Sequence, residues 1–217
     1  MLKPMVDVKF FGESCFLVAG RQTSLLFDPV SQEKKRSLTL EADVVLLTDR
    51  QKYQQLADNL GKSGAGAPFV ISGPGEYEIS KATIVGLAAA GGKLDAGVER
   101  KITIYQTEVD GLTFGHLGNL GGKLTQSQLE VFGGVDVLMV PVGDKSGLRG
   151  KESIEVIAQV EPKIVIPMGF GQESGTTSAL DQFLSQIGKE KVSHLAKLSL
   201  SKDKFPEEMQ VVVLSQV

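Results

Sequence analysis

The stretch ADVVLLTD, residues 42–49, is the segment from which the fold is predicted. Its apolar residues follow one another without the alternation of a half-exposed strand, so they indicate a strand buried on both faces. A second stretch of the same kind, VDVLMVPVGD, occupies residues 135–144. Each stretch follows a hairpin and a polar or helical connector. This doubling predicts two similar halves, each with a sheet and its own helices.

Helices are predicted where apolar residues recur three and four positions apart. Two such stripes are Tyr53, Leu56, Ala57 and Leu60, and Leu180, Phe183, Leu184 and Ile187. Two further helices are expected, one after the Thr125–Gln128 capping-box spacing and one over residues 152–160, before Pro162. Asp110-Gly111 between two apolar runs predicts a hairpin.

The rest of the chain reads as short strands and connectors. Residues 88–97 are rich in alanine and glycine and predict a loop, while the polar residues 31–42 predict a loop or a short helix. Two sheets packed face to face with helices outside give an α/β fold (α+β by some schemes). We therefore expect a four-layer αββα sandwich, with residues 1–217 as a single domain.

Composition narrows the class of protein. Lys and Arg number 23 against 26 Asp and Glu, a net charge of −3 that argues against a nucleic-acid partner. No apolar run approaches the roughly 20 residues that a membrane span needs, and the N-terminus shows no apolar signal core. Cys15 is the single cysteine, so no internal disulfide can form. We expect a cytoplasmic protein that binds an unknown small molecule or protein; a homo-oligomer stays open.

Histidine is scarce, which limits metal chemistry. The chain has two histidines, His116 and His194, and neither has a paired ligand spacing with Cys15. A zinc site usually takes three or four His, Cys or carboxylate ligands. We expect His116 to be a hydrogen-bonded, partly buried histidine, His194 to be exposed, and Cys15 to be a small core residue.

Several motifs occur in a familiar order along the chain. They are GESCFLV (12–18), LLFDP (25–29), DVVLLT (43–48), GPGEYEI (73–79) and GHLGNLG (115–121). Together they resemble the metallo-β-lactamase superfamily, and within it the Zn-dependent hydrolases of the β-lactamase fold. The resemblance covers about residues 6–190. It implies the four-layer fold and a site that in this family holds one or two metal ions.

The family's metal-binding residues are replaced in this chain. The motif Thr-His-x-His-x-Asp-His becomes Thr48 followed by DRQKYQ. Elsewhere an amide replaces the bridging aspartate, a glycine replaces a late histidine, and residues 88–91 offer no further histidine. The resemblance therefore implies a vestigial site at six positions: Asp49, Gln51, Tyr53, Gln54, Asn119 and Gly169.

Two functions follow from these replacements. Because hydrolysis in this fold uses metal to make hydroxide, we predict a pseudoenzyme that works by binding or assembly, with no metal cofactor. The alternative is a metal-dependent hydrolase of a small phosphoester or lactone with a rebuilt carboxylate site. Glu13, Asp28 and Asp49 are then the metal candidates, with Asn119 beside them, and such oxygen ligands suit Mg²⁺ or Ca²⁺. Asp28 and Asn119 could instead orient loops through hydrogen bonds.

Overall fold

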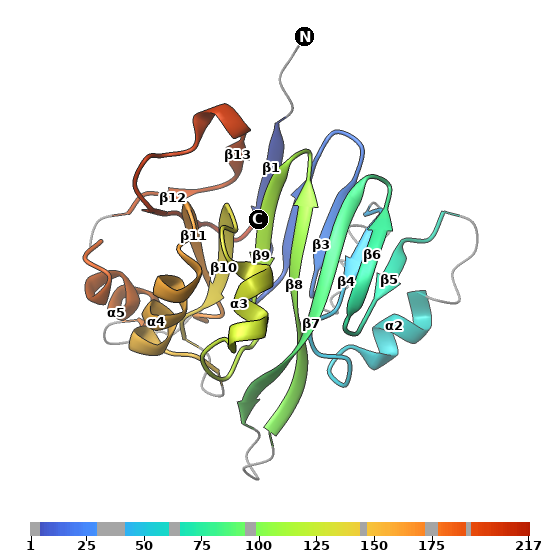
Figure 1. The fold of residues 1–217 in the computed structure, drawn as a ribbon, viewed down its shortest axis with the longest axis horizontal. Coiled ribbons are helices and arrows are strands. Elements are labelled where there is room, and N and C mark those ends of the chain that lie inside the picture. Colours follow the sequence, from blue (N-terminus) through green and yellow to red (C-terminus); the bar gives the residue numbers. More distant parts are fainter. Residues whose placement is uncertain are drawn as a thin grey trace.

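The first of two large sheets is built mainly from the N-terminal third of the chain. The computed structural model describes residues 5–29, 42–60, 66–93, 99–143, 147–171, 178–189 and 192–217 (Figure 1). Six strands form this sheet in the order β13 (Leu198–Leu200), β1 (Val6–Phe10), β2 (Phe16–Ala19), β3 (Ser24–Phe27), β4 (Val44–Leu46) and β5 (Phe69–Ile71). Strands β13 to β3 pair antiparallel, and β3, β4 and β5 pair parallel.

The second sheet repeats this combination of antiparallel and parallel strands. Its seven strands are β14 (Gln210–Val211), β11 (Ile164–Met168), β10 (Val137–Pro141), β9 (Leu112–His116), β8 (Glu99–Val109), β7 (Ala82–Lys93) and β6 (Gly75–Ile79). Strands β14 to β9 are parallel, and β9 to β6 are antiparallel. A small pair, β12 (His194–Leu195) and β15 (Val213–Leu214), completes the strands.

Helices cover the outer faces of both sheets. In the described part of the chain these helices are α2 (Gln54–Leu60), α3 (Gln126–Phe132), α4 (Gly150–Val160) and α5 (Ala179–Gln186), with a 3₁₀ turn η2 (Lys202–Lys204). The predicted capping box is present at α3, where Gln128 N donates to Thr125 Oγ1 and Gln128 Oε1 accepts from Thr125 N. None of the described helices is long and apolar enough to cross a membrane.

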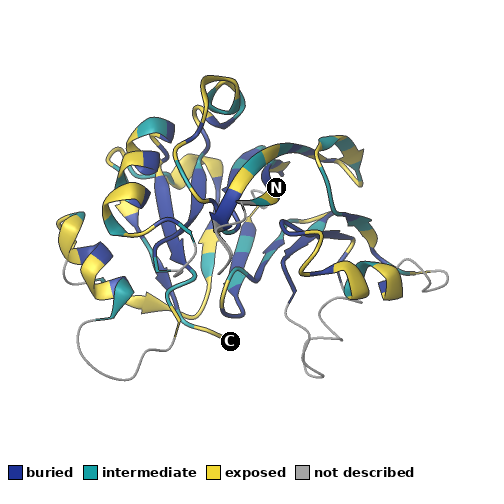
Figure 2. Cartoon of the chain, turned by 90° about the horizontal axis from the view of Figure 1, so that it is seen from below, coloured by how far each residue is buried: buried dark blue, intermediate teal, exposed yellow. Residues whose placement is uncertain are grey.

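Alternating side chains of β3 and β4 show why the fold has four layers. Leu25 and Leu46 are fully buried between the two sheets, whereas Leu26 and Val45 point to the other face, where they pack with Leu60 of α2. Buried residues accordingly follow the strands, while the helices expose their outer sides (Figure 2). The helices α3, α4 and α5 pack their apolar faces on the second sheet. The αββα sandwich predicted from the sequence is confirmed.

Two local predictions meet different outcomes. At the predicted hairpin, Asp110 and Gly111 both have positive φ, 50° and 78°, as the tight turns that suit twisted hairpins require. The loop predicted at residues 88–97 is wrong for residues 88–93, because β7 continues to Lys93 and pairs with β8, with a register shift between Ala90 and Lys93; residues 94–97 lie outside the described residues. The small residues there are packing constraints, since a Cβ at Gly91 would lie 2.7 Å from Ile102 Cγ2. The polar segment 31–42 lies, except for Ala42, outside the described residues.

Candidate functional site

A cleft opens where the parallel strands of both sheets end. Segments following β3, β4, β9, β10 and β11 all contribute to it, as expected for sheets whose ligand sites lie beyond the carboxyl ends of parallel strands. Its volume is about 540 Å³. The described residues that line it are Glu13, Ser14, Asp28, Thr48, Asp49, Lys52, Tyr53, Arg100, Gly118, Asn119, Pro141, Gly143, Met168, Gly169, Phe170 and Gly171.

Asp28 joins the ends of β3 and β4. Its backbone is left-handed, with φ 43°, and its side chain is 1% exposed. Thr48 N donates to Asp28 Oδ1 at 2.8 Å, and Thr48 Oγ1 donates to Asp28 Oδ2 at 2.6 Å. Both carboxylate oxygens are thus engaged by one threonine. The interpretation that Asp28 orients a loop fits this geometry better than a role as a metal ligand.

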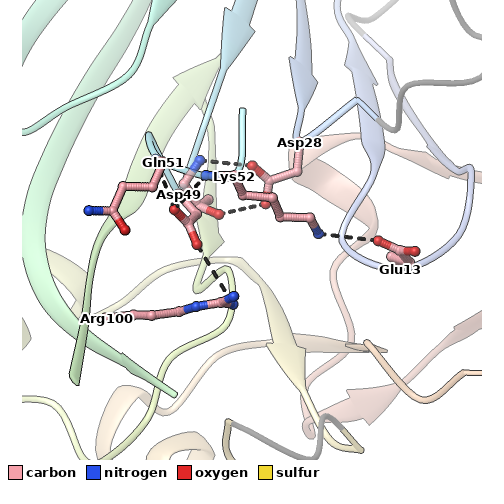
Figure 3. A network of polar contacts seen from close by, with 7 residues as sticks. Glu13, Asp28, Asp49, Gln51, Lys52 and Arg100 are labelled. Atoms are coloured by element: carbon pink, nitrogen blue, oxygen red, sulfur yellow. Dashed lines mark hydrogen bonds and ion pairs between the residues drawn. The ribbon is translucent and has the colours of Figure 1, made fainter. Parts of the chain in front are cut away.

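Asp49 caps the turn that leads into α2. Its Oδ1 accepts from Gln51 N and Lys52 N, each at 3.0 Å, and its carbonyl accepts from Tyr53 N. Such caps satisfy the N–H groups that the start of a helix leaves unpaired. The other oxygen, Oδ2, lies 3.7 Å from Arg100 Nη1 (Figure 3). Asp49 therefore has one structural oxygen and one oxygen that faces a cation.

Lys52 and Tyr53 form the wall on the α2 side. Lys52 Nζ lies 3.3 Å from Glu13 Oε2 and 5.1 Å from the centre of the Tyr53 ring. Tyr53 is 6% exposed and packs with Cys15 and Leu47. Burial, with the Asp28 carboxylate nearby, raises the pKa of the Tyr53 phenol far above its ordinary value, so the ring stays neutral. These contacts place Tyr53 in the core, as its position on the apolar stripe with Leu56 and Leu60 indicates.

His116 supports the cleft from behind. Gly118 N lies 3.2 Å from His116 Nδ1, and because a backbone N–H can only donate, Nδ1 is an acceptor. Nε2 then carries the proton and donates to Ser14 O at 2.9 Å. The ring stacks on Phe27 and is 0% exposed, so it is buried more completely than expected. Exposed His194 and buried Cys15 match their predictions.

Stability should therefore fall in mild acid through His116. Burial lowers the pKa of folded His116 below the value of about 6.5 that an unfolded histidine has, only partly offset by Asp28 and Ser14 O. Above pH 6.5 the His116 ring is neutral in both the folded and the unfolded chain. Below pH 6.5 the ring of the unfolded chain takes up a proton first. The free energy of unfolding should then drop by up to about 1.4 kcal/mol per pH unit until the folded pKa is reached.

Urea unfolding between pH 7.5 and 5.5 measures this dependence. A His116→Asn variant should lose the slope that His116 contributes, while His194→Asn, which changes an exposed ring, should keep it. Equal slopes in both variants would show that His116 does not couple to folding in this range.

The structure gathers four of the six vestigial positions. Asp49, Tyr53, Asn119 and Gly169 line the cleft. Gln51 and Gln54 are exposed and do not line the cleft. Gln54 instead lines a smaller pocket together with Ala57 of α2 and Val70 of β5. The metal candidates Glu13 and Asp28 also reach the cleft. The sequence analysis did not identify Lys52 and Arg100. Lys52 lies inside the replaced motif, at one of its variable positions, whereas nothing in the sequence sets Arg100 apart from other strand residues.

The donor set does not match the metal site of the family. Among the described residues, no group of three or more His, Cys, Asp and Glu side chains is placed to hold a metal ion. Asp28 is engaged by Thr48, Asp49 by two backbone N–H groups and Arg100, and Glu13 by Lys52. Each of these three carboxylates is therefore already engaged by groups of the protein itself.

Fold and cleft together define an αββα sandwich with its site between the two sheets, and comparison with known proteins names the family. The model of the β-lactamase superfamily domain matches residues 7–169. The chain belongs to this family, within the metallo-β-lactamase superfamily. The resemblance inferred from the motifs is confirmed.

Relatives and solved structures agree with this assignment. A UPF0173 metal-dependent hydrolase of Pelotomaculum thermopropionicum is 23% identical over 76% of this chain and 84% of its own length. A second UPF0173 metal-dependent hydrolase, from Thermococcus onnurineus, is 22% identical over 85% of this chain and 93% of its own length. A Thermotoga maritima structure, named as a proposed Zn-dependent hydrolase, covers 97% of this chain and 98% of its own, with 26% identity and a TM-score of 0.68.

These relatives correct two predictions made from the sequence. The predicted pseudoenzyme and the expected lack of a metal cofactor were wrong, because similar chains are named metal-dependent hydrolases. Both predictions took the loss of histidines as loss of chemistry. Loss of a ligand pattern removes one way of activating water; it does not remove the cleft or its charged groups.

Proposed function

We propose that this protein is a hydrolase that cleaves a small phosphoester or lactone in the cleft between its two sheets. The observation that carries the proposal is the cleft itself, which lies at the carboxyl ends of the parallel strands and contains Asp49 beside Arg100. Its volume of about 540 Å³ suits a small substrate. The names of the relatives support hydrolysis as the class of reaction.

Asp49 is the carboxylate best placed to act on water. Asp28 has both oxygens engaged by Thr48, and Glu13 is 61% exposed at the rim. The Asp49 side chain is 11% exposed, and its Oδ2 has one ion pair, with Arg100. Oδ2 would accept a proton from water as the oxygen of that water attacks the phosphorus or acyl carbon. The ester bond to the leaving group breaks, and the leaving alkoxide takes up the proton.

An activity screen tests the proposal. Phosphoesters and lactones are offered to the full chain, with and without Mg²⁺, Mn²⁺, Ca²⁺ and Zn²⁺, so that any metal requirement is measured directly. Asp49→Asn keeps a side chain that caps helices well but removes the charge. It should lower turnover about 100-fold or more, as loss of a general base does.

Asp181→Asn is the matched control, because Asp181 also serves a helix N-terminus, accepting from Ser178 at the start of α5, outside the cleft. That variant should keep full activity. No activity on any substrate, or activity indifferent to Asp49, would contradict the proposal.

We also propose a cytoplasmic location and a small-molecule partner. The lone Cys15 and the net charge of −3 support this, as does the small cleft. Cell fractionation checks the location. Recovery of the protein in a secreted fraction would contradict it.

A further inference from the structure

We infer that Lys52 and Arg100 bind the phosphoryl group of an anionic substrate at the mouth of the cleft. This inference rests on the proposed function, because it chooses the phosphoester over the lactone. The two side chains come from different halves of the molecule. Lys52 lies just before α2, on the first sheet's side, and Arg100 lies in β8 of the second sheet (Figure 3).

Arg100 has hydrogen-bonding capacity that its described neighbours do not use. The side chain is 29% exposed, and its partner Asp49 Oδ2 is 3.7 Å away. A hydrogen bond from nitrogen to oxygen is normally 2.7–3.2 Å long. A guanidinium carries five N–H donors in a planar fork that fits two oxygens of a phosphate at once. Asp49 therefore holds Arg100 near the cleft without satisfying its donors.

Two weak contacts, with the Tyr53 ring and with Glu13, orient the Lys52 side chain. Its Nζ lies 5.1 Å from the centre of the Tyr53 ring, whose face attracts cations. Its ion pair with Glu13 joins side chains that are 46% and 61% exposed. Exposed pairs of this kind contribute little because water screens them. A phosphoryl dianion can therefore replace Glu13 at Lys52 at low cost.

Asp28 and one oxygen of Asp49 are engaged by hydrogen bonds of the protein rather than by these two cations. Asp28 faces the N–H and hydroxyl of Thr48, and Asp49 Oδ1 faces the N–H groups of Gln51 and Lys52. Their negative charge is thus partly met by hydrogen bonds of the protein itself. Lys52 and Arg100 are the two cationic side chains among the described residues that line the cleft, and their charge favours an oxyanion. A neutral lactone would leave Lys52 with its exposed ion pair to Glu13 and Arg100 with its long ion pair to Asp49.

Titration with inorganic phosphate tests the inference without turnover. Phosphate is added to the full chain at low salt, and binding is followed by calorimetry and by amide chemical shifts. The Lys52→Met/Arg100→Met double variant should bind phosphate about tenfold more weakly or worse, since it loses both charged donors. Lys123→Met removes an exposed lysine that pairs with Glu155 outside the cleft and should bind as the unaltered chain does.

The outcomes separate this inference from the proposed function. Phosphate binding that is lost in the double variant supports the inference, even if no ester is hydrolysed. No binding to the unaltered chain, or equal binding to the double variant, overturns it, even if a lactone is hydrolysed. Lys52→Met alone changes one exposed side chain and keeps the test valid if the double variant does not fold.

Discussion

Replacing Asp28 with alanine is expected to lower the free energy of unfolding by about 3 kcal/mol. The variant leaves the N–H and the hydroxyl of Thr48 without their acceptor, and both belong to a residue that is 3% exposed. Each unsatisfied buried donor costs about 1–3 kcal/mol. Alanine also adopts the φ of 43° less readily than aspartate does. Urea unfolding at pH 7.5 measures the loss.

Asp43 provides the matched control, because it also accepts from the N–H and the hydroxyl of one residue, but at the surface. Ser24 N and Ser24 Oγ each donate to Asp43 Oδ2 at 2.7 Å, and Asp43 is exposed. In Asp43→Ala water replaces the carboxylate, so the loss should stay below about 1 kcal/mol. Similar losses for the two variants would show that Asp28 is not the buried connection between β3 and β4 described above.

Gly121→Ala is expected to cost about 2 kcal/mol and to disturb Asn119. A Cβ at this position would collide with the backbone carbonyl of Gly91 in β7, and a backbone cannot move aside as a flexible side chain can. The segment is held there by hydrogen bonds from Gly121 N to Ala90 O and from Gly92 N to Asn119 O. Separating the two backbones moves Asn119, which lines the cleft.

Gly122, the next residue, provides the matched control for Gly121→Ala. A Cβ at Gly122 would have no atom within 4 Å, so Gly122→Ala should leave stability unchanged or raise it by up to about 1 kcal/mol. Thermal unfolding of the two variants gives the difference directly. Equal melting temperatures would mean that the Gly121–Gly91 approach adapts without cost.

Helical geometry explains which residues after Thr48 reach the cleft. Side chains three and four positions apart share a helix face. Asp49 begins a helical turn, with Tyr53 N bonded to Asp49 O, so Lys52 and Tyr53 return to its side. Gln51 and Gln54, two and five positions on, point elsewhere. Matching these positions to a family motif located the segment correctly but did not predict which of its side chains face the substrate.

The sequence by itself determined the family, the four layers and the helices. These depend on hydrophobic periodicity and on motifs that are local in the chain, and both survive the loss of metal ligands. Tertiary structure alone decided that Arg100 of β8 meets Asp49, 51 positions earlier in the chain, and that small residues near position 91 form a strand against its neighbour. Contacts between distant segments depend on how the two sheets pack, and no local sequence pattern specifies which residues this packing brings together.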